Sequence, residues 1–257
     1  MNDLVSIITP NYNCAQYIVK TILSVQAQTY NNWEMLIVDD CSSDNSCKAI
    51  APYLESDKRI KLISNEKNYG AAVSRNQALK AARGRWIAFL DSDDLWAPEK
   101  LERQIRFMQE HNLKFSYTKY SEIDSDGKET GIVVSGPKRI SRVGMYAFCW
   151  PGCLTVMYDA NAIGLVQIKD IKKNNDYAMW LKVCQKADCY LLQEDLATYR
   201  RGRSGSISSH SIGTMIKWHY KLFHDAEEMS ALSSIWYTGV NLVFGLYKKL
   251  VYVKKTE

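Results

Sequence analysis

The chain of 257 residues has seven cysteines but no C-x-x-C pair, and it has only four histidines. An odd number of cysteines without close pairs argues against a disulfide framework and against a zinc site. His210, His219 and His224 have no metal-ligand spacing, so we interpret them as surface or core residues. The first residues, MNDLVSIITP, lack a basic start and a long apolar run, so no signal peptide is predicted and a reducing cytoplasm is expected.

Two phosphate-binding motifs are also absent. Neither G-x-G-x-x-G nor G-x-x-x-x-G-K-[ST] occurs, which argues against a Rossmann dinucleotide site and against a P-loop. No DNA- or RNA-binding signature is visible, although the net charge is +5. That charge is uneven: residues 1–137 carry 16 Lys and Arg against 18 Asp and Glu, whereas residues 138–257 carry 17 against 10. The basic C-terminal half favours an anionic membrane surface or a diphosphate-bearing substrate as partner. A nucleic-acid partner is not expected.

The hydrophobic content of 46% is enough for a substantial core, and the first half shows a regular alternation. Short apolar runs rich in β-branched residues predict strands, and the amphipathic stretches between them predict helices. The predicted strands are 4–10, 33–39, 60–64 and 85–91, and the predicted helices are 14–28, 44–55 and 70–83. This alternation indicates a mostly parallel sheet with helices on both faces, an α/β nucleotide-binding architecture.

Polar residues follow three of the four predicted strands. They are Thr9 to Tyr12, Asp39-Asp40, and the acidic cluster Asp91-Ser92-Asp93-Asp94. Ligands of open parallel sheets bind at the carboxyl ends of the strands, so these groups are expected to converge on one ligand. The alternative for a lone acid is a helix cap, which we favour for Asp44. Three acids in four positions repel one another, so the cluster is expected to hold a cation or a positive partner.

At this point the sequence resembles a known family. The segments that carry the resemblance are VSIITPNYN, LIVDDCSSDNS, NYGAAVSRNQAL, ARGRWIAFLDSDDLWAPEKL, NDYAMWLKV and YRRGRSGSIS. They are similar, in order, to the motifs of family 2 inverting glycosyltransferases with the GT-A fold, particularly bacterial enzymes of teichuronic acid, O-antigen or capsule synthesis. The resemblance implies a GT-A catalytic domain over 1–210, and a helical, basic extension over 211–257. Within the domain, about 1–110 would bind the nucleotide-sugar and 111–210 would supply the acceptor site and the base.

The resemblance implies a UDP-sugar donor, with nucleotide contacts from Pro10, Tyr12, Asp40, Arg75, Asp91, Ser92 and Asp93. Tyr12 would stack on uracil and Asp40 would accept a hydrogen bond from the base, while Asp39 is expected to support the loop. Arg75 is expected either near the nucleotide or as a solvated residue of its helix.

The acidic cluster resembles the D-x-D motif of this family. Asp91 would lie near the ribose, and Asp93 would bind Mn²⁺ or Mg²⁺ bridging the two phosphates of the donor. The metal would neutralise charge on the departing UDP. Asp94 is expected to support this metal site or to face the acceptor.

The catalytic base implied by the resemblance is Asp176, in the segment NDYAMWLKV. Asn175 stands where the family frequently has Glu. Taken alone, Asp176 is typical of a helix cap, but the surrounding motifs favour the base. A single displacement predicts inversion, so that an α-linked UDP-sugar would yield a β-glycoside.

The segment from Tyr199 to Ser206 resembles the basic, Gly- and Ser-rich loop of nonprocessive members. Arg200, Arg203 and Ser204 are therefore expected to reach the diphosphate. Trp150 and Trp180 are expected either to stack on an acceptor sugar or, as is commoner for tryptophan in an apolar run, to belong to the core.

The tail from Ser234 to Lys255 is apolar and aromatic and has two lysine pairs. Asn241 and the Lys248-Lys249 pair interrupt it too early for a spanning helix. It predicts a helix lying in the membrane interface, at the cytoplasmic face of the inner membrane. Such a location would suit a lipid-linked saccharide acceptor. The alternative is a helix packed on the catalytic domain or in a homodimer.

Three other functions remain as alternatives. A sugar-nucleotide pyrophosphorylase would need a Gly-rich, basic loop after the first strand, which is missing. A receiver-type domain would be half as long and would leave residues 138–257 unexplained. A noncatalytic scaffold of a polysaccharide-assembly complex would bind nucleotide without turnover, and the intact Asp40, Asp93 and Asp176 argue against it.

Overall fold

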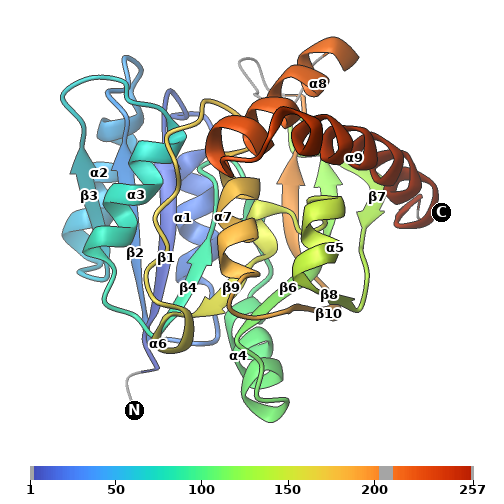
Figure 1. The fold of residues 1–257 in the computed structure, drawn as a ribbon. Helices are drawn as coiled ribbons and strands as arrows, with labels where there is room; N and C mark the ends of the chain where they lie inside the picture. Colours follow the sequence, from blue (N-terminus) through green and yellow to red (C-terminus); the bar gives the residue numbers. More distant parts are fainter. Residues whose placement is uncertain (1–2, 203–210, 256–257) are drawn as a thin grey trace.

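The computed structural model describes residues 3–202 and 211–255 and contains one mixed sheet flanked by helices (Figure 1). The main path of the sheet has the strand order β11-β7-β6-β9-β4-β1-β2-β3, with β10 joining β5, β6 and β8 beside it. In the first half the strands are β1 (Val5–Asn11), β2 (Trp33–Asp39), β3 (Ile60–Ser64) and β4 (Trp86–Phe89), and the helices are α1 (Ile18–Gln26), α2 (Ser46–Ser56) and α3 (Ala71–Ala81). The elements predicted from residue periodicity are therefore confirmed, and β1 pairs in parallel with both β2 and β4.

The helix expected at 14–28 begins at Ile18, because the residues before it form an anchoring turn. The main-chain N–H of Cys14 donates to Ser46 Oγ at 2.9 Å, and that of Ala15 donates to Asp44 Oδ2 at 2.9 Å. Asp44 also accepts from the N–H of Ser46, the first residue of α2. The N-cap position of α2 is Asn45, so Asp44 does not occupy the cap itself, but its carboxylate accepts from the first helical N–H and ties the turn before α1 to α2.

The second half adds short and partly antiparallel elements. They are β5 (Leu95–Trp96), α4 (Lys100–Glu110), β6 (Phe115–Ile123), β7 (Glu129–Val134), β8 (Arg139–Ile140), α5 (Arg142–Ala147), a 3₁₀ turn (Cys153–Thr155), β9 (Met157–Asp159), α6 (Ala160–Ile163), α7 (Asn175–Val183) and β10 (Cys189–Arg200). Strand β9 pairs antiparallel with β4 and β6, while β10 runs parallel to β6. The sheet is thus parallel from β1 to β4 and mixed beyond β4.

The C-terminal residues fold onto this sheet as α8 (Ile212–Lys221), a π-helical turn (Leu222–Ala226), α9 (Ala231–Val251) and β11 (Val253–Lys255). Strand β11 pairs antiparallel with β7 at the sheet edge, so the end of the tail is a strand where a helix was predicted. Residues of the π-helical turn belong to the same buried cluster as β4 and α7. The extension is therefore part of the folded core.

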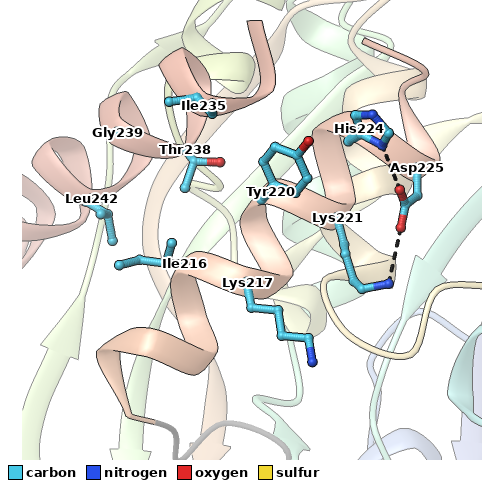
Figure 2. Close-up of a pocket in the computed structure, with 10 residues that line it drawn as sticks. All are labelled: Ile216, Lys217, Tyr220, Lys221, His224, Asp225, Ile235, Thr238, Gly239 and Leu242. Carbon is cyan, nitrogen blue, oxygen red and sulfur yellow. Dashed lines mark hydrogen bonds and ion pairs between the residues drawn. The ribbon is translucent and has the colours of Figure 1, made fainter. Parts of the chain in front are cut away.

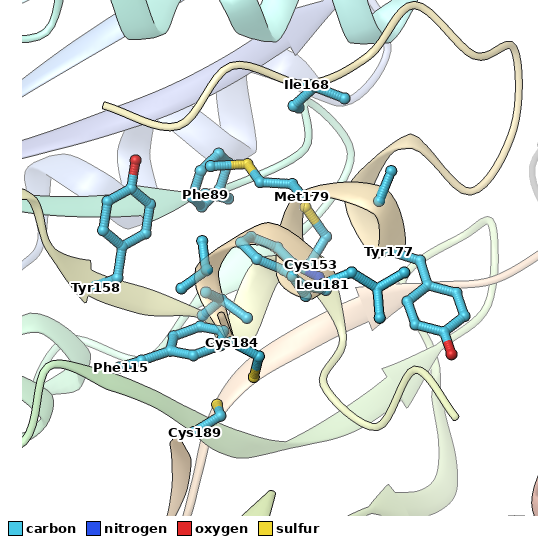
Figure 3. Packing of buried hydrophobic residues seen from close by; sticks show 14 of the residues in the cluster. Phe89, Phe115, Cys153, Tyr158, Ile168, Tyr177, Met179, Leu181, Cys184 and Cys189 are labelled. Carbon is cyan, nitrogen blue, oxygen red and sulfur yellow. The ribbon is translucent and has the colours of Figure 1, made fainter. Parts of the chain in front are cut away.

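Helix α7 lies inside this core, where Met179 joins Phe89 of β4 and Phe115 of β6 (Figure 3). Such dense packing holds side chains in fixed positions. The start of α7, which carries Asp176, is therefore held in place relative to β4.

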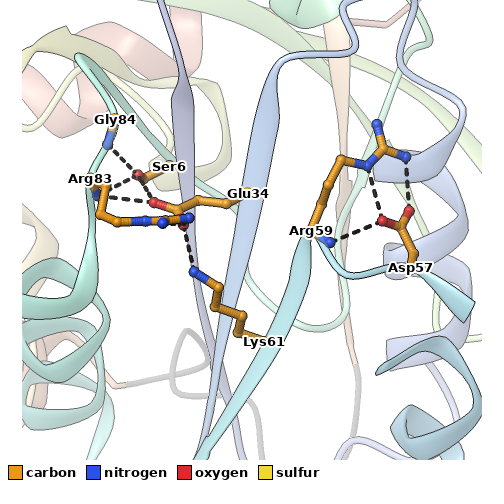
Figure 4. A network of polar contacts seen from close by, with 7 residues as sticks. All are labelled: Ser6, Glu34, Asp57, Arg59, Lys61, Arg83 and Gly84. Atoms are coloured by element: carbon orange, nitrogen blue, oxygen red, sulfur yellow. Dashed lines mark hydrogen bonds and ion pairs between the residues drawn. The ribbon is translucent and has the colours of Figure 1, made fainter. Parts of the chain in front are cut away.

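Near the start of β2, a buried carboxylate, Glu34, links β1, β3 and the segment after α3 (Figure 4). It accepts from Ser6 Oγ at 2.8 Å, from Lys61 Nζ at 2.9 Å and from Arg83 Nη2 at 2.8 Å. Burial opposes its charge, but these donors prevail and lower the pKa of Glu34 to about 2. A Cβ at Gly84 would lie 2.6 Å from the carbonyl oxygen of Leu4, so only glycine fits beside this network.

Candidate functional site

The carboxyl ends of β1, β2 and β4 meet at one edge of the sheet, as the sequence predicts. Asn11 lies opposite Asp39 in the register of β1 and β2, and the N–H of Asp40 donates to Asn11 O at 2.8 Å. The N–H of Leu90 donates to Ile8 O at 3.1 Å, which aligns the start of the acidic cluster with the same edge. Pro10 lies within β1, and Tyr12, which follows the strand, is 46% exposed, so its ring is accessible to a ligand.

Asp39 and Asp40 both fix loops at this edge. Asp39 accepts from Asn11 Nδ2 and from Ser42 Oγ, each at 2.6 Å, in agreement with the supporting role expected for it. Asp40 accepts from Asn65 Nδ2 at 2.7 Å and from the N–H groups of Tyr69 and Gly70, at 2.9 and 2.7 Å. A carboxylate offers about four lone-pair sites, so Asp40 keeps capacity for one more donor.

The main chain of the acidic cluster is anchored to α1. Thr21 Oγ1 donates to the carbonyl oxygens of Ser92 and Asp94, at 3.0 and 2.9 Å. Cys14 Sγ donates to Ser92 O at 3.3 Å. Ser92 is buried, so its side chain packs against the fold. This anchoring sets the direction in which the neighbouring carboxylates leave the loop.

Asp94 points inward, and Arg200 holds it there. The side chain of Asp94 is buried, and its Oδ1 accepts from the N–H of Arg200 at 2.9 Å. Burial, followed by the charges of Asp93 and Asp91, raises the pKa of Asp94 well above its usual range. The guanidinium of Arg200 donates to the carbonyl oxygens of Asp93 and Asp124, at 3.0 and 3.1 Å. Arg200 therefore braces the acidic loop with a buried side chain, and its contact with a diphosphate stays a prediction.

A divalent cation fits the donor chemistry of this loop. Burial is the main reason why the pKa of Asp94 is raised, and the charges of Asp93 and Asp91 add to it; a cation would relieve this repulsion between the carboxylates. No group of three or more His, Cys, Asp or Glu side chains with metal-site geometry occurs in residues 3–202 and 211–255. Mg²⁺-type sites commonly use one or two carboxylates plus substrate phosphates and water, so a single protein ligand is sufficient.

Arg75 of α3 links the acidic loop to the start of α7. Its Nη2 lies 2.5 Å from Asp91 Oδ1, and its Nη1 lies 2.5 Å from Asn175 Oδ1. Burial opposes the charge of Arg75, but the carboxylates of Asp91 and Asp176 outweigh it and raise the pKa of the guanidinium. Arg75 is therefore buried, and the alternative of a solvated residue is wrong; its place near the nucleotide stays a prediction. Its link to Asn175 was not predicted, because a contact across 100 residues leaves no local signal.

Asp176 lies beside this link, one residue into α7. Its Oδ1 accepts from the N–H of Tyr177 at 2.8 Å. Burial raises the pKa of Asp176, and the positive charge of Arg75 opposes this rise. A carboxylate with a raised pKa at a ligand-binding edge suits proton transfer.

Trp150 and Trp180 both have packing roles. Trp180 has no exposed surface and packs edge-on against Phe89, with ring centroids 5.0 Å apart. Trp150 is buried against Phe244 of α9, and its indole N–H donates to Gly144 O at 3.0 Å. The faces that would stack on a sugar are covered in both rings, so the core interpretation applies. Arg203 and Ser204 lie outside the described residues.

A comparison with protein families identifies this arrangement. The model described as glycosyl transferase family 2 matches residues 6–147, which include the acidic loop, and full-length relatives match far more. The chain belongs to glycosyltransferase family 2. It is therefore a glycosyltransferase, and the resemblance stated above is confirmed.

Three curated relatives span nearly the whole chain. TuaG of Bacillus subtilis, named for teichuronic acid biosynthesis, is 39% identical over 91% of this chain and 92% of its own length. The Escherichia coli UDP-Glc:alpha-D-GlcNAc-diphosphoundecaprenol beta-1,3-glucosyltransferase WfgD is 39% identical over 96% of both chains. WfaP of Escherichia coli, which bears the same enzyme name, is 40% identical over 84% of both chains.

Solved structures confirm the GT-A fold. Staphylococcus aureus TarS 1–349 in complex with UDP-GlcNAc superposes with a TM-score of 0.70, at 20% identity, over 96% of this chain and 72% of that one. The mannosyltransferase PcManGT of Pyrobaculum calidifontis, in complex with GDP-Man and Mn²⁺, gives 0.67 at 15% identity, over 97% and 70%. At these identities the likeness establishes the fold alone.

Proposed function

We propose that this glycosyltransferase moves a sugar from a UDP-sugar to a saccharide carried on a lipid diphosphate, in bacterial surface polysaccharide synthesis. The reaction would be metal-dependent, inverting and nonprocessive. The observation that supports this best is the Arg75 bridge, because it brings Asp176 to the same sheet edge as Asp91. A donor-binding loop and a base are thereby joined through one buried side chain.

The donor would bind along the edge formed by β1, β2 and β4. The exposed ring of Tyr12 is available to stack on uracil, and Asp40 has a free acceptor site for the base. Asp91 and Asp93 would face the ribose and diphosphate. Relatives named for UDP-Glc and a fold neighbour solved with UDP-GlcNAc support UDP as the nucleotide.

Asp93 would hold Mn²⁺ or Mg²⁺ together with the donor phosphates. When bound, the cation neutralises negative charge on the leaving UDP. Asp91 forms an ion pair with Arg75, and Asp94 accepts from the Arg200 N–H. We assign Asp93 as metal ligand because it is the last acid of the segment that resembles the D-x-D motif.

Asp176 would accept the proton of the acceptor hydroxyl as that oxygen attacks the anomeric carbon. Attack from the face opposite UDP inverts the configuration, so an α-linked donor yields a β-glycoside. Asn175 carries no charge, so the positive charge of Arg75 is shared between Asp91 and Asp176. Arg75 would act as a positioning residue that keeps Asp176 directed at the donor.

The raised pKa of Asp176 predicts a loss of activity in acid. A base must be deprotonated, so kcat/KM should fall as pH drops through a pKa above the usual ~3.9 of aspartate. In wild type the positive charge of Arg75 stabilises the carboxylate form of Asp176. Arg75→Gln removes that charge, so the pKa of Asp176 should rise and the acid limb should move to higher pH. Arg75→Lys keeps the charge and should leave the limb near its wild-type position. Rate profiles against pH for the three proteins measure this, and an unmoved limb in Arg75→Gln would contradict the coupling.

A peripheral position on the cytoplasmic face of the inner membrane is also part of this proposal. Helix α9 turns its polar residues Ser234, Thr238 and Asn241 toward the protein, while Val243, Leu246 and Leu250 are 61–76% exposed. None of the helices in the described part of the chain is long and apolar enough to cross a membrane. Lys249 is exposed beside this stripe, whereas Lys248 turns inward and donates to Trp150 O at 2.7 Å. An outward apolar stripe with a basic residue beside it is typical of a helix lying in the interface.

Leu246→Glu with Leu250→Glu should therefore reduce flotation with anionic liposomes, because the stripe would lose apolar area and gain negative charge. Leu23→Glu on α1, where Leu23 is 49% exposed, is the matched control. Point changes are preferable to deleting 234–257, which would uncover Trp150 and Tyr177. Equal flotation of wild type and the double variant would contradict the interfacial position.

Release of UDP tests the function itself. Purified protein with Mn²⁺ and GlcNAc-diphosphoundecaprenol would be supplied in turn with UDP-glucose, UDP-galactose, UDP-GlcNAc, UDP-GalNAc and UDP-glucuronate. We expect acceptor-dependent UDP release with one of them, and the named relatives make UDP-glucose the first to try. UDP binding without release under every condition would favour the noncatalytic scaffold.

A further inference from the structure

A groove of about 670 Å³ lies between α8 and α9 (Figure 2). Its walls are mainly apolar, and Ile216 of α8 faces Leu242 of α9 across it. Gly239 forms part of the α9 wall, and a Cβ built there would meet nothing within 4 Å. The groove is therefore open at Gly239, with room for an apolar ligand to lie against the helix backbone.

One wall of the groove is basic. Lys217 and Lys221 of α8 line it, and Lys221 lies 3.4 Å from Asp225. Lys217 is exposed and makes no ion pair among the residues that the structure describes. An apolar trough with a free ammonium group at its side complements a ligand that has an aliphatic chain and an anionic head.

The two helices that form the groove both contact the residue next to the proposed base. On another face of α8, His219 packs edge-on against Tyr177, with ring centroids 6.4 Å apart. Tyr177 directly follows Asp176 in α7. Asn241 of α9 donates to the hydroxyl of Tyr177 at 3.2 Å, so both helices of the groove contact the residue next to the base.

We propose that the α8–α9 groove binds the isoprenoid chain of the acceptor, with Lys217 contacting the diphosphate that joins chain and sugar. This inference rests on the proposed function, since it names how the lipid part of that acceptor is recognised. An aliphatic chain suits the apolar walls of the groove. The diphosphate would give the ammonium group of Lys217 an anionic partner. Held in this way, the sugar of the acceptor would extend past α8 toward Asp176.

Gly239→Phe should block the groove, because the new ring would enter the space beside Ile216. The probes are GlcNAc diphosphate esterified with farnesol and the same diphosphate esterified with methanol. The farnesyl compound disperses in water, so no bilayer is needed. For Gly239→Phe, KM of the farnesyl acceptor should rise about tenfold or more, because buried methylene contacts are lost. KM for the methyl acceptor, KM for UDP-glucose and kcat should stay at wild-type values.

Gly213→Phe is the matched control, because Gly213 is exposed on α8, its Cβ would also meet nothing within 4 Å, and it does not line the groove. Ile216→Ser, which removes a groove contact at a 41% exposed position, is the second variant in case Gly239→Phe does not fold. Ile216→Ser should also raise the KM of the farnesyl acceptor. Equal KM values for the two acceptors in wild type, or equal shifts for both in the variants, would overturn the proposal.

Calorimetry with farnesyl diphosphate separates this inference from the function. Wild type and Gly213→Phe should bind the probe, whereas Gly239→Phe should bind it about tenfold more weakly or not at all. Binding of this kind without any sugar transfer would overturn the proposed function and leave the groove assignment standing. Transfer to the methyl acceptor with no binding of farnesyl diphosphate would do the opposite.

Discussion

Asp176→Asn should lower sugar transfer by ~10²–10⁴-fold while leaving the affinity for UDP-sugar unchanged, because removal of a general base commonly costs that much. The substitution is nearly isosteric, and the Asn oxygen can still accept from the N–H of Tyr177. Arg75 keeps its ion pair with Asp91, so the donor loop should stay in place. Single-turnover transfer measures the chemistry, and calorimetry with UDP-glucose measures binding.

The matched control is Asp170→Asn, an exposed acid in the segment that precedes α7. It should leave both transfer and binding unchanged. If donor affinity fell in parallel with transfer in Asp176→Asn, Asp176 would be a donor-site or structural residue, and the assignment of the base would fail.

Asp93→Asn should abolish the metal dependence of UDP binding while the protein stays folded. The side chain of Asp93 lies outside the two hydrophobic clusters, and Arg200 holds this residue through its carbonyl oxygen, which the substitution keeps. Losing one of the three carboxylates should also ease the repulsion that raises the pKa of Asp94. Calorimetry of UDP with and without Mn²⁺, beside a thermal melt, gives both quantities.

Asp126→Asn serves as control, since Asp126 is an exposed acid in the turn between β6 and β7. Its affinity for UDP should keep the wild-type response to Mn²⁺. An unchanged, still metal-dependent affinity in Asp93→Asn would show that the cation is held by other groups.

The sequence was sufficient to predict the sheet edge, because alternating periodicity and parallel strand order depend on local patterns. Asp39 ends β2 and Asp40 follows it where expected, and Asp91 follows β4 at the same edge. What it could not predict are contacts between distant segments. The Arg75–Asn175 bond, and the N–H of Arg200 on Asp94, depend on how the two halves pack.

The orientation of the C-terminal helix α9 could not be predicted from the sequence either. Its composition indicates an apolar helix, but only the structure shows that polar residues face inward. Asn241 turns toward the protein because the carbonyl of Tyr146 and the hydroxyl of Tyr177 accept from its amide, at 3.1 and 3.2 Å. Val243, Leu246 and Leu250 are left on the outside, while Phe244 packs on Trp150. Burial of this kind cannot be seen in a run of residues.

The configuration of the product tests the single-displacement mechanism most directly. Wild-type protein with Mn²⁺ would be supplied with the donor that gives UDP release, UDP-glucose first, and with GlcNAc diphosphate esterified with farnesol, and the anomeric coupling of the product would be read by NMR. Transfer with Asp176 as base predicts a β-glycosidic bond from the α-linked donor. An α-linked product would mean retention of configuration and would contradict the role of Asp176 as the base of a single displacement.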